Sequence, residues 1–162
     1  MKQKYLVLFS LSGLILSLDR LTKHWVHTHW FEGVTLPVIP GLLSFTRAHN
    51  NGFAFGLLKS ASNTLQEIFF IAVPIFALVL IVLIFIKLQD EQMGTSVALT
   101  TIFSGAVGNL LDRFRYGYVV DFLKIHWQDK LSFPAFNIAD CAILFGVIIM
   151  FVNTLKQDPT KG

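Results

Sequence analysis

Charged residues are scarce in this chain. Asp, Glu, Lys and Arg make up 14% of its 162 residues, whereas hydrophobic residues make up 54%. An average soluble domain carries about 25% charged residues. The mean hydropathy of +0.62 is also high. This composition excludes an ordinary soluble domain and indicates an integral membrane protein.

Cysteine is nearly absent as well. The single Cys141 lies inside an apolar run, so the chain has no disulfide framework and no cysteine-rich metal site. His24, His27 and His29 are close in sequence, but no acidic residue or cysteine completes a metal shell at ligand spacing. We therefore predict no metal and no cofactor. The net charge of +3 indicates contact with anionic lipid headgroups and not with nucleic acid.

Long apolar runs predict an α-helical membrane fold. A membrane-spanning helix needs about 20 apolar residues, and four such runs are present, at residues 4–24, 68–87, 95–112 and 137–155. We find no internal repeat and no linker, and we expect one integral-membrane domain over residues 1–162.

The first run resembles a signal peptide, because Lys2 and Lys4 precede an apolar core. No small-residue cleavage site follows, and Asp19 and Arg20 come instead. We therefore expect a retained first helix. Its two lysines are expected to reach toward the membrane interface.

Residues 31–58 have a different pattern. Two runs of strand-forming residues, 34–39 and 43–49, are separated by proline and glycine, and Asn51-Gly52 is a strong turn signal. The segment is too polar to span a membrane and too apolar for a free loop. We predict a small β-sheet or hairpin that lies on the membrane surface between the first two helices.

Two carboxylates, Asp121 and Asp140, lie at the mouths of the third and fourth predicted helices. Carboxylates at the edge of hydrocarbon are costly, and they are candidates for function by default. Asp121 stands among apolar residues, which favours a raised pKa. Two carboxylates that share a site cannot both ionise easily, so one keeps a proton near neutral pH. Such a pair can activate water and protonate a leaving amine, as in aspartic proteases.

Each acid also has a structural explanation. Asp140 follows Asn137 by three residues and is a possible first-turn acid of a helix capped by Asn137. Asp112 stands beside Arg113, and an ion pair between them is the ordinary interpretation. Asp19 and Lys23 are four residues apart and can pair on one helix face. The residues alone leave these alternatives open.

Four spans place both chain ends on one side, with the predicted sheet and the connection 114–136 on the other. The sheet side holds more Lys and Arg, so the positive-inside rule would place the ends outside the cell. Several of those cations stand near acids that can pair with them, so the charge count does not decide the orientation.

Five ordered motifs carry a family resemblance. They are DRLTK (19–23), NNGFAFG (50–56), SGAVGNLLDR (104–113), VVDF (119–122) and FPAFNIAD (133–140). Together they resemble the lipoprotein signal peptidase (signal peptidase II) family over nearly the whole chain. The resemblance implies an aspartic endopeptidase that cleaves diacylglyceryl-modified prolipoproteins on the amino-terminal side of the lipidated cysteine. It further implies a multi-pass protein of the bacterial inner membrane, with cytoplasmic termini and an active site near the periplasmic surface.

By the same resemblance, Asp121 and Asp140 form the catalytic pair. Substrate-binding and supporting roles fall on Asp19, Lys23, Asn50, Gly52, Asn109, Asp112, Arg113, Asn137 and Ala139. The implied partners are prolipoproteins, membrane phospholipids and globomycin-type inhibitors, and the implied state is a monomer. A non-catalytic lipid or peptide carrier is the alternative. The second acid argues against it, because anionic lipids call for Arg and Lys.

Overall fold

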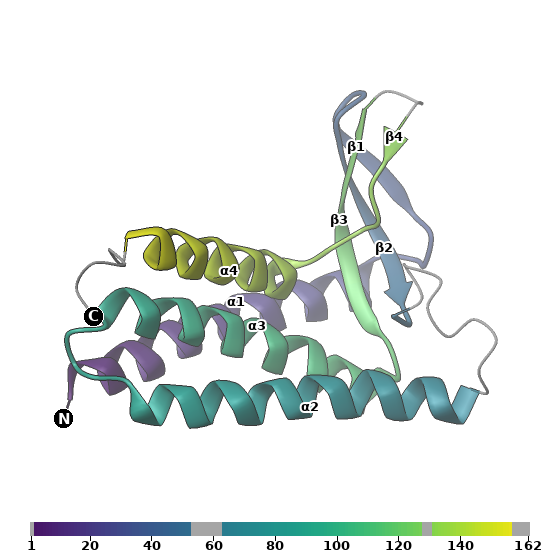
Figure 1. Cartoon of the computed structure of the whole chain (residues 1–162). Helices are drawn as coiled ribbons and strands as arrows, with labels where there is room; N and C mark the ends of the chain where they lie inside the picture. Colours follow the sequence, from purple (N-terminus) through teal and green to yellow (C-terminus); the bar gives the residue numbers. More distant parts are fainter. Residues whose placement is uncertain (1, 53–62, 128–130, 157–162) are drawn as a thin grey trace.

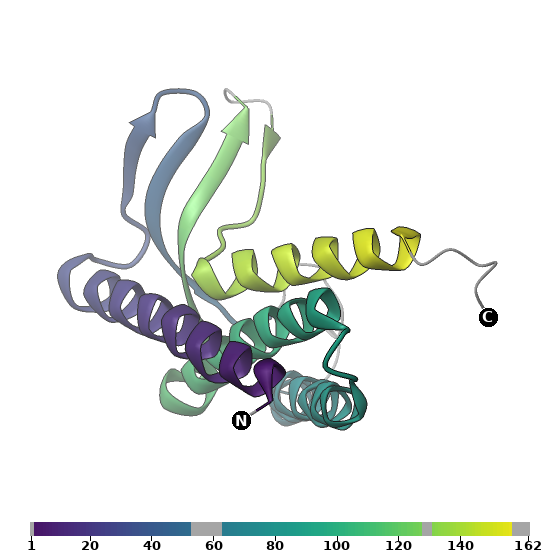
Figure 2. The same cartoon turned by 90° about the vertical axis from the view of Figure 1, so that its left-hand side faces the viewer.

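The structure is a computed structural model that describes residues 2–52, 63–127 and 131–156. Its long helices are α1 (Gln3–His29), α2 (Asn63–Lys87), α3 (Met93–Tyr116) and α4 (Ile138–Lys156). They extend in the same general direction in Figure 1, whereas Figure 2 shows α1 and α4 inclined to α2. All four are long and apolar enough to cross a membrane. The predicted four-span fold is confirmed. The helices α1 and α3 extend past their predicted ends, and α2 begins at Asn63, before its predicted start at residue 68.

A four-stranded antiparallel sheet stands across one end of the helices (Figure 2). Its order follows the sequence, with β1 (Thr35–Ile39), β2 (Leu43–Asn50), β3 (Val119–Trp127) and β4 (Leu131–Ser132). The first two strands confirm the predicted sheet. The other two come from the connection between α3 and α4, where no strand was predicted. The first four residues of β3 are all buried, so this strand lacks the polar–apolar alternation that reveals a half-buried strand.

Two turns of the sheet region require glycine. Gly41, between β1 and β2, has φ +77°, and Gly52, just after β2, has φ +85°. Only glycine adopts such angles without steric cost, so Gly52 has the positive φ that the turn predicted at Asn51-Gly52 requires. Phe53 and Phe55, which follow Gly52 in the fourth-to-last and second-to-last positions of the motif 50–56, lie outside the described residues.

Glycines allow α3 and α4 to pack closely. A Cβ atom on Gly105 would clash with the backbone oxygen of Ala139, and one on Gly146 would lie 2.8 Å from the backbone oxygen of Ala98. Small residues of this kind bring helix backbones together in membranes, where the hydrophobic effect does not drive association. This contact places the start of α4 beside the last turns of α3.

The end of α2 is tied to α1 by a buried lysine. Lys4 donates from Nζ to the carbonyl oxygens of Phe85, Ile86 and Leu88, at 3.3, 3.1 and 2.6 Å. Carbonyls in and just after the last helical turn lack partners within the helix, and a cation there also stabilises the helix dipole. Lys4 is 2% exposed. The polar partners of its ammonium group therefore come from the end of α2.

We predict that Lys4→Met lowers the free energy of unfolding by about 1–3 kcal/mol, the cost of leaving buried carbonyls without donors. The measurement is the melting temperature of the detergent-solubilised protein. Lys2→Met is the matched control, because Lys2 is exposed. Equal melting temperatures for the two variants would show that the Lys4 contacts contribute nothing.

Candidate active site

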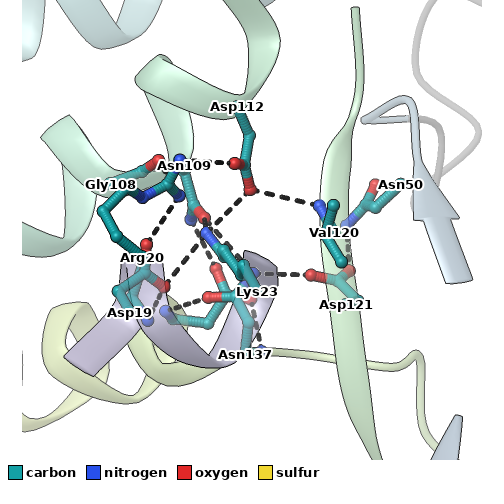
Figure 3. Close-up of polar contacts among 12 residues, drawn as sticks. Asp19, Arg20, Lys23, Asn50, Gly108, Asn109, Asp112, Val120, Asp121 and Asn137 are labelled. Atoms are coloured by element: carbon teal, nitrogen blue, oxygen red, sulfur yellow. Dashed lines mark hydrogen bonds and ion pairs between the residues drawn. The ribbon is translucent and has the colours of Figure 1, made fainter. Parts of the chain in front are cut away.

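Four buried or half-buried charges meet where α1 packs on α3. Lys23 Nζ lies 3.0 Å from Asp19 Oδ1 and 2.9 Å from Asp112 Oδ2. Arg20 reaches the other oxygen of each acid, at 2.8 Å from Asp19 and 2.7 Å from Asp112 (Figure 3). Each cation therefore bridges both carboxylates. We call this group the ion cluster. Removing one member would leave a buried charge without its partner, which is strongly destabilising.

The pairing predicted between Asp112 and Arg113 is wrong. Adjacent residues on a helix point in different directions, so Asp112 faces α1 while Arg113 does not. The half-buried guanidinium of Arg113 makes no hydrogen bond or ion pair with the described part of the chain. Arg20 takes the place expected for Arg113. It stands beside Asp19 in the first motif, and that position was the available signal for it.

The ion cluster also fixes the start of α4. Asp19 Oδ1 accepts a hydrogen bond from the Ala139 amide at 3.1 Å, and Arg20 donates to the backbone oxygen of Gly108 at 2.9 Å. A Cβ atom on Gly108 would lie 2.7 Å from Asp19 Oδ2. The helices α1, α3 and α4 therefore meet at one point, and only glycine fits there on α3.

Asn109 connects the ion cluster to Asp140. Its Oδ1 accepts hydrogen bonds from Lys23 Nζ at 2.9 Å and from Asn137 Nδ2 at 3.2 Å. A lysine ammonium group can only donate, so it fixes the amide with its oxygen toward Lys23. The Nδ2 group of Asn109 then donates to Asp140 Oδ1 at 2.7 Å. The ion cluster thereby sets which atoms face the carboxylate.

Asn137 caps α4 and also joins the two candidate acids. Its Oδ1 accepts the Asp140 amide at 3.0 Å, and Asp140 Oδ2 accepts the Asn137 amide at 3.1 Å. This reciprocal pair is a capping box, and it confirms the predicted N-cap. The Nδ2 group of Asn137 also donates to Asp121 Oδ1 at 2.6 Å. Asn137 and Asp140 can therefore cap α4 and belong to the candidate acid site at the same time.

Asp121 comes from β3 and is 1% exposed. In Figure 3 its side chain points from the strand toward Asn137. The next two amides, of Phe122 and Leu123, both donate to the carbonyl oxygen of Phe136, at 3.0 and 2.8 Å. Two successive donors on one acceptor mark a β-bulge, which bends a strand and changes the direction of its side chains.

A second asparagine holds Asp121 from the sheet. Asn50 donates from Nδ2 to Asp121 Oδ2 at 2.8 Å, and its Oδ1 accepts the Gly52 amide at 2.8 Å. The backbone amide can only donate, so it fixes the orientation of the Asn50 side chain, as Lys23 does for Asn109. All four oxygens of the two candidate acids thus accept an N–H group of fixed direction.

Burial is the first cause that raises the pKa of Asp121, and the negative charge of Asp140 is the second. Hydrogen bonds from Asn50 and Asn137 and the positive charge of Lys23 oppose them, and the pKa rises from 3.8 to about 7. A carboxyl group with this pKa can hold or release a proton at neutral pH, as acid–base catalysis requires.

A cavity of about 240 Å³ opens beside Asp121 and Asn50. The rest of its lining comes from Ala48, His49, Asn51, Pro134 and Ala135. The carboxyl group of Asp121 is otherwise buried in β3. The cavity gives a substrate or a water molecule access to it.

A family model described as Signal peptidase (SPase) II matches residues 11–156. The chain belongs to the signal peptidase II family. A lipoprotein signal peptidase of Geobacter metallireducens is 39% identical over 158 residues, which cover 98% of this chain and 96% of that protein. One of Geobacter sulfurreducens is 42% identical over 147 residues, which cover 91% and 90%. Membership in this family makes the chain a peptidase.

Two solved structures share the fold of this signal peptidase II chain. Both are described as bacterial membrane enzyme structures obtained by the in meso method, at 2.3 and 1.9 Å resolution. Both are 32% identical in sequence, with TM-scores of 0.81 and 0.80. They cover 100% and 98% of this chain, and the chain covers 93% and 96% of them.

The raised pKa of Asp121 predicts a specific pH dependence of stability. A carboxyl group whose pKa is higher in the folded than in the unfolded state contributes its full stabilisation at pH values below the pKa of the unfolded state. That contribution is lost as the pH rises from about 4 through about 7, and it is on the order of 4 kcal/mol. We expect Asp121→Asn to remove this loss, because the amide stays neutral. Melting temperatures at pH 4 to 8 test this, with Asp90→Asn as the exposed-acid control. An unchanged pH slope in Asp121→Asn contradicts the prediction.

We predict that Gly52→Ala lowers peptidase turnover per folded molecule at least 10-fold. Its Cβ would lie 2.5 Å from the ring of Phe70, so the turn must shift, and with it the amide that orients Asn50. Gly41→Ala is the control. It has a similar positive φ, which costs about 1–2 kcal/mol in either variant, but nothing lies within 4 Å. Equal turnover in the two variants would mean that the position of Gly52 does not matter for the site.

Proposed function

We propose that this protein is an aspartic endopeptidase that cleaves diacylglyceryl-modified prolipoproteins on the amino-terminal side of the lipidated cysteine. The observation that carries the proposal is the acid pair. Asn137 joins Asp121 and Asp140, and one of the two has a pKa of about 7. The substrate class is supported by relatives described as lipoprotein signal peptidases.

In this mechanism one acid of the pair is ionised and the other holds a proton. The ionised acid takes a proton from water as the water oxygen bonds to the scissile carbonyl carbon. The protonated acid donates to the carbonyl oxygen. When the carbon–nitrogen bond breaks, the acid that took the proton from water donates it to the leaving amine. The other acid takes a proton from a hydroxyl of the tetrahedral intermediate as the carbonyl forms again, so the pair holds one proton as it did at the start. Asn50, Asn109 and Asn137 hold the acids in place for these transfers.

The remaining site residues divide into two groups. Asp19, Lys23, Asp112 and Ala139 position the pair through the ion cluster and the start of α4. Asn50, Gly52 and Arg113 surround the approach to the acids and contact the substrate. The Arg113 guanidinium makes no hydrogen bond or ion pair with the described residues, although the charges of Asp140 and Asp121 act on it. Its donors are therefore available to substrate carbonyls or to globomycin-type inhibitors.

We place the protein in the bacterial inner membrane as a monomer with one domain over residues 1–162. The start of α1 and the end of α4 lie at the same end of the helices, opposite the sheet (Figure 1). Both termini are therefore on one side, which we assign to the cytoplasm. The sheet and the acid pair then lie near the periplasmic surface, among membrane phospholipids.

Turnover of a diacylglyceryl precursor by protein in lipid nanodiscs tests the function. We expect Asp121→Asn and Asp140→Asn to fold and bind precursor, with turnover lower by several orders of magnitude. Asp112→Asn should lower the melting temperature, because it weakens a buried ion pair, while the folded fraction keeps measurable turnover. The unlipidated precursor is the substrate control and should be cut poorly.

Two results would overturn this assignment. If wild-type protein binds the precursor and never cuts it, the chain is a carrier. If Asp121→Asn keeps its turnover while Asp112→Asn abolishes it at an unchanged melting temperature, the acid pair is Asp112 with Asp140.

A further inference from the structure

A second cavity lies at the C-terminal end of α1, beside Phe122 of β3. Its volume is about 310 Å³, and it is lined by Leu21, Trp25, Val26 and Trp30, with Phe45 of β2 and Phe122 of β3. Thr22 completes the lining, and its hydroxyl already donates to the backbone oxygens of Leu18 and Asp19, at 2.7 and 3.1 Å. The cavity is therefore apolar, and it shares no lining residue with the cavity beside Asp121.

An exposed apolar stripe on α1 leads to this cavity. Leu14, Leu18, Leu21 and Trp25 are 58%, 46%, 67% and 50% exposed, and their spacing places them on one helix face. On a membrane-spanning helix such a face contacts lipid chains. Trp25 and Trp30 end the stripe, and tryptophan is enriched at the boundary between chains and headgroups. The mouth of the cavity therefore lies at the depth where the acyl chains begin, next to the headgroups.

We propose that this cavity binds one acyl chain of a membrane phospholipid. The cavity is open to the surface, because Leu21 and Trp25 of its lining are 67% and 50% exposed. An unfilled gap there would forfeit dispersion contacts along the lining. A lipid chain at the mouth can fill it without leaving an apolar environment.

The bound chain supports the strand that carries Asp121. Val26 of α1 and Phe122 of β3 already belong to one buried cluster with Val120, and they also line the cavity. A chain in the cavity extends this cluster between α1 and the sheet. Phe122 directly follows Asp121, so the lipid steadies the acid pair through its neighbour. Binding does not depend on the proposed function, whereas an effect on turnover does.

The first test fills the cavity by substitution. Thr22→Phe places a ring in the lining. Thr28→Phe is the matched control, because Thr28 also donates to the carbonyl oxygen four residues earlier and lies outside the cavity. Palmitoyl-oleoyl-phosphatidylglycerol is titrated into delipidated protein in detergent, and bound lipid is counted by native mass spectrometry. We expect one saturable lipid on wild type and on Thr28→Phe, and at least 10-fold weaker binding to Thr22→Phe.

A second variant opens the cavity and adds no bulk, so the test stands even if Thr22→Phe does not fold. Trp25→Ala removes one wall, and Phe9→Ala, which is 67% exposed on the same helix, is its control. Only Trp25→Ala should weaken lipid binding. Unchanged binding in Trp25→Ala, or binding to wild type that does not saturate, overturns the proposal.

Kinetics with the lipidated precursor separate the phospholipid from the substrate's own chains. We expect Thr22→Phe to keep the KM of wild type, and phosphatidylglycerol to raise kcat in delipidated wild type several-fold. A raised KM with unchanged phospholipid binding would assign the cavity to the substrate, which overturns the proposal. If no precursor is cut at all, the proposed function fails while the lipid count still decides the cavity.

Discussion

The ion cluster of two carboxylates and two cations, where α1 meets α3, determines the positions of α4 and β3. Buried charges persist only when each has a partner, so the helices must meet in the one arrangement that pairs all four. The unused oxygen lone pairs then bind elsewhere. Asp19 accepts the amide of Ala139 at the start of α4, and Asp112 accepts the amide of Val120 in β3 at 3.2 Å. The elements that carry the two candidate acids are thus both fixed to this one group.

The direction of two amide groups follows from the same logic. An asparagine side chain presents an oxygen on one side and a nitrogen on the other, and little distinguishes the two in shape. Lys23 settles the choice for Asn109, and the Gly52 amide settles it for Asn50, because both of these partners only donate. Each asparagine then offers N–H to a carboxylate. The acids receive defined donors while their remaining lone pairs stay available for a proton or a water molecule.

Local sequence predicted the four spans, the first two strands and the cap of α4, because each depends on neighbouring residues or on run length. The partners of Asp112 and the strand β3 depend on packing between segments that are distant in the sequence. The hydrophobic periodicity of a segment carries no information about such packing. Charge counting was uninformative for a related reason. Lys4 binds carbonyls, and Arg20 and Lys23 bind acids, whereas the positive-inside rule concerns cations in free loops.

The pairing of β2 with β3 brings together segments that are far apart in the chain. Asn50 and Asp121, which meet across this pair, are separated by 71 positions, and α2 and α3 lie between them. Long-range pairing of this kind forms late, since the intervening chain must first be placed. The strand β3 can reach β2 only after two intervening helices have entered the membrane, and Asp140 arrives with the last helix. A chain still under synthesis therefore lacks the assembled acid pair. Any activity that needs both acids is therefore available only after α4 has joined the other helices.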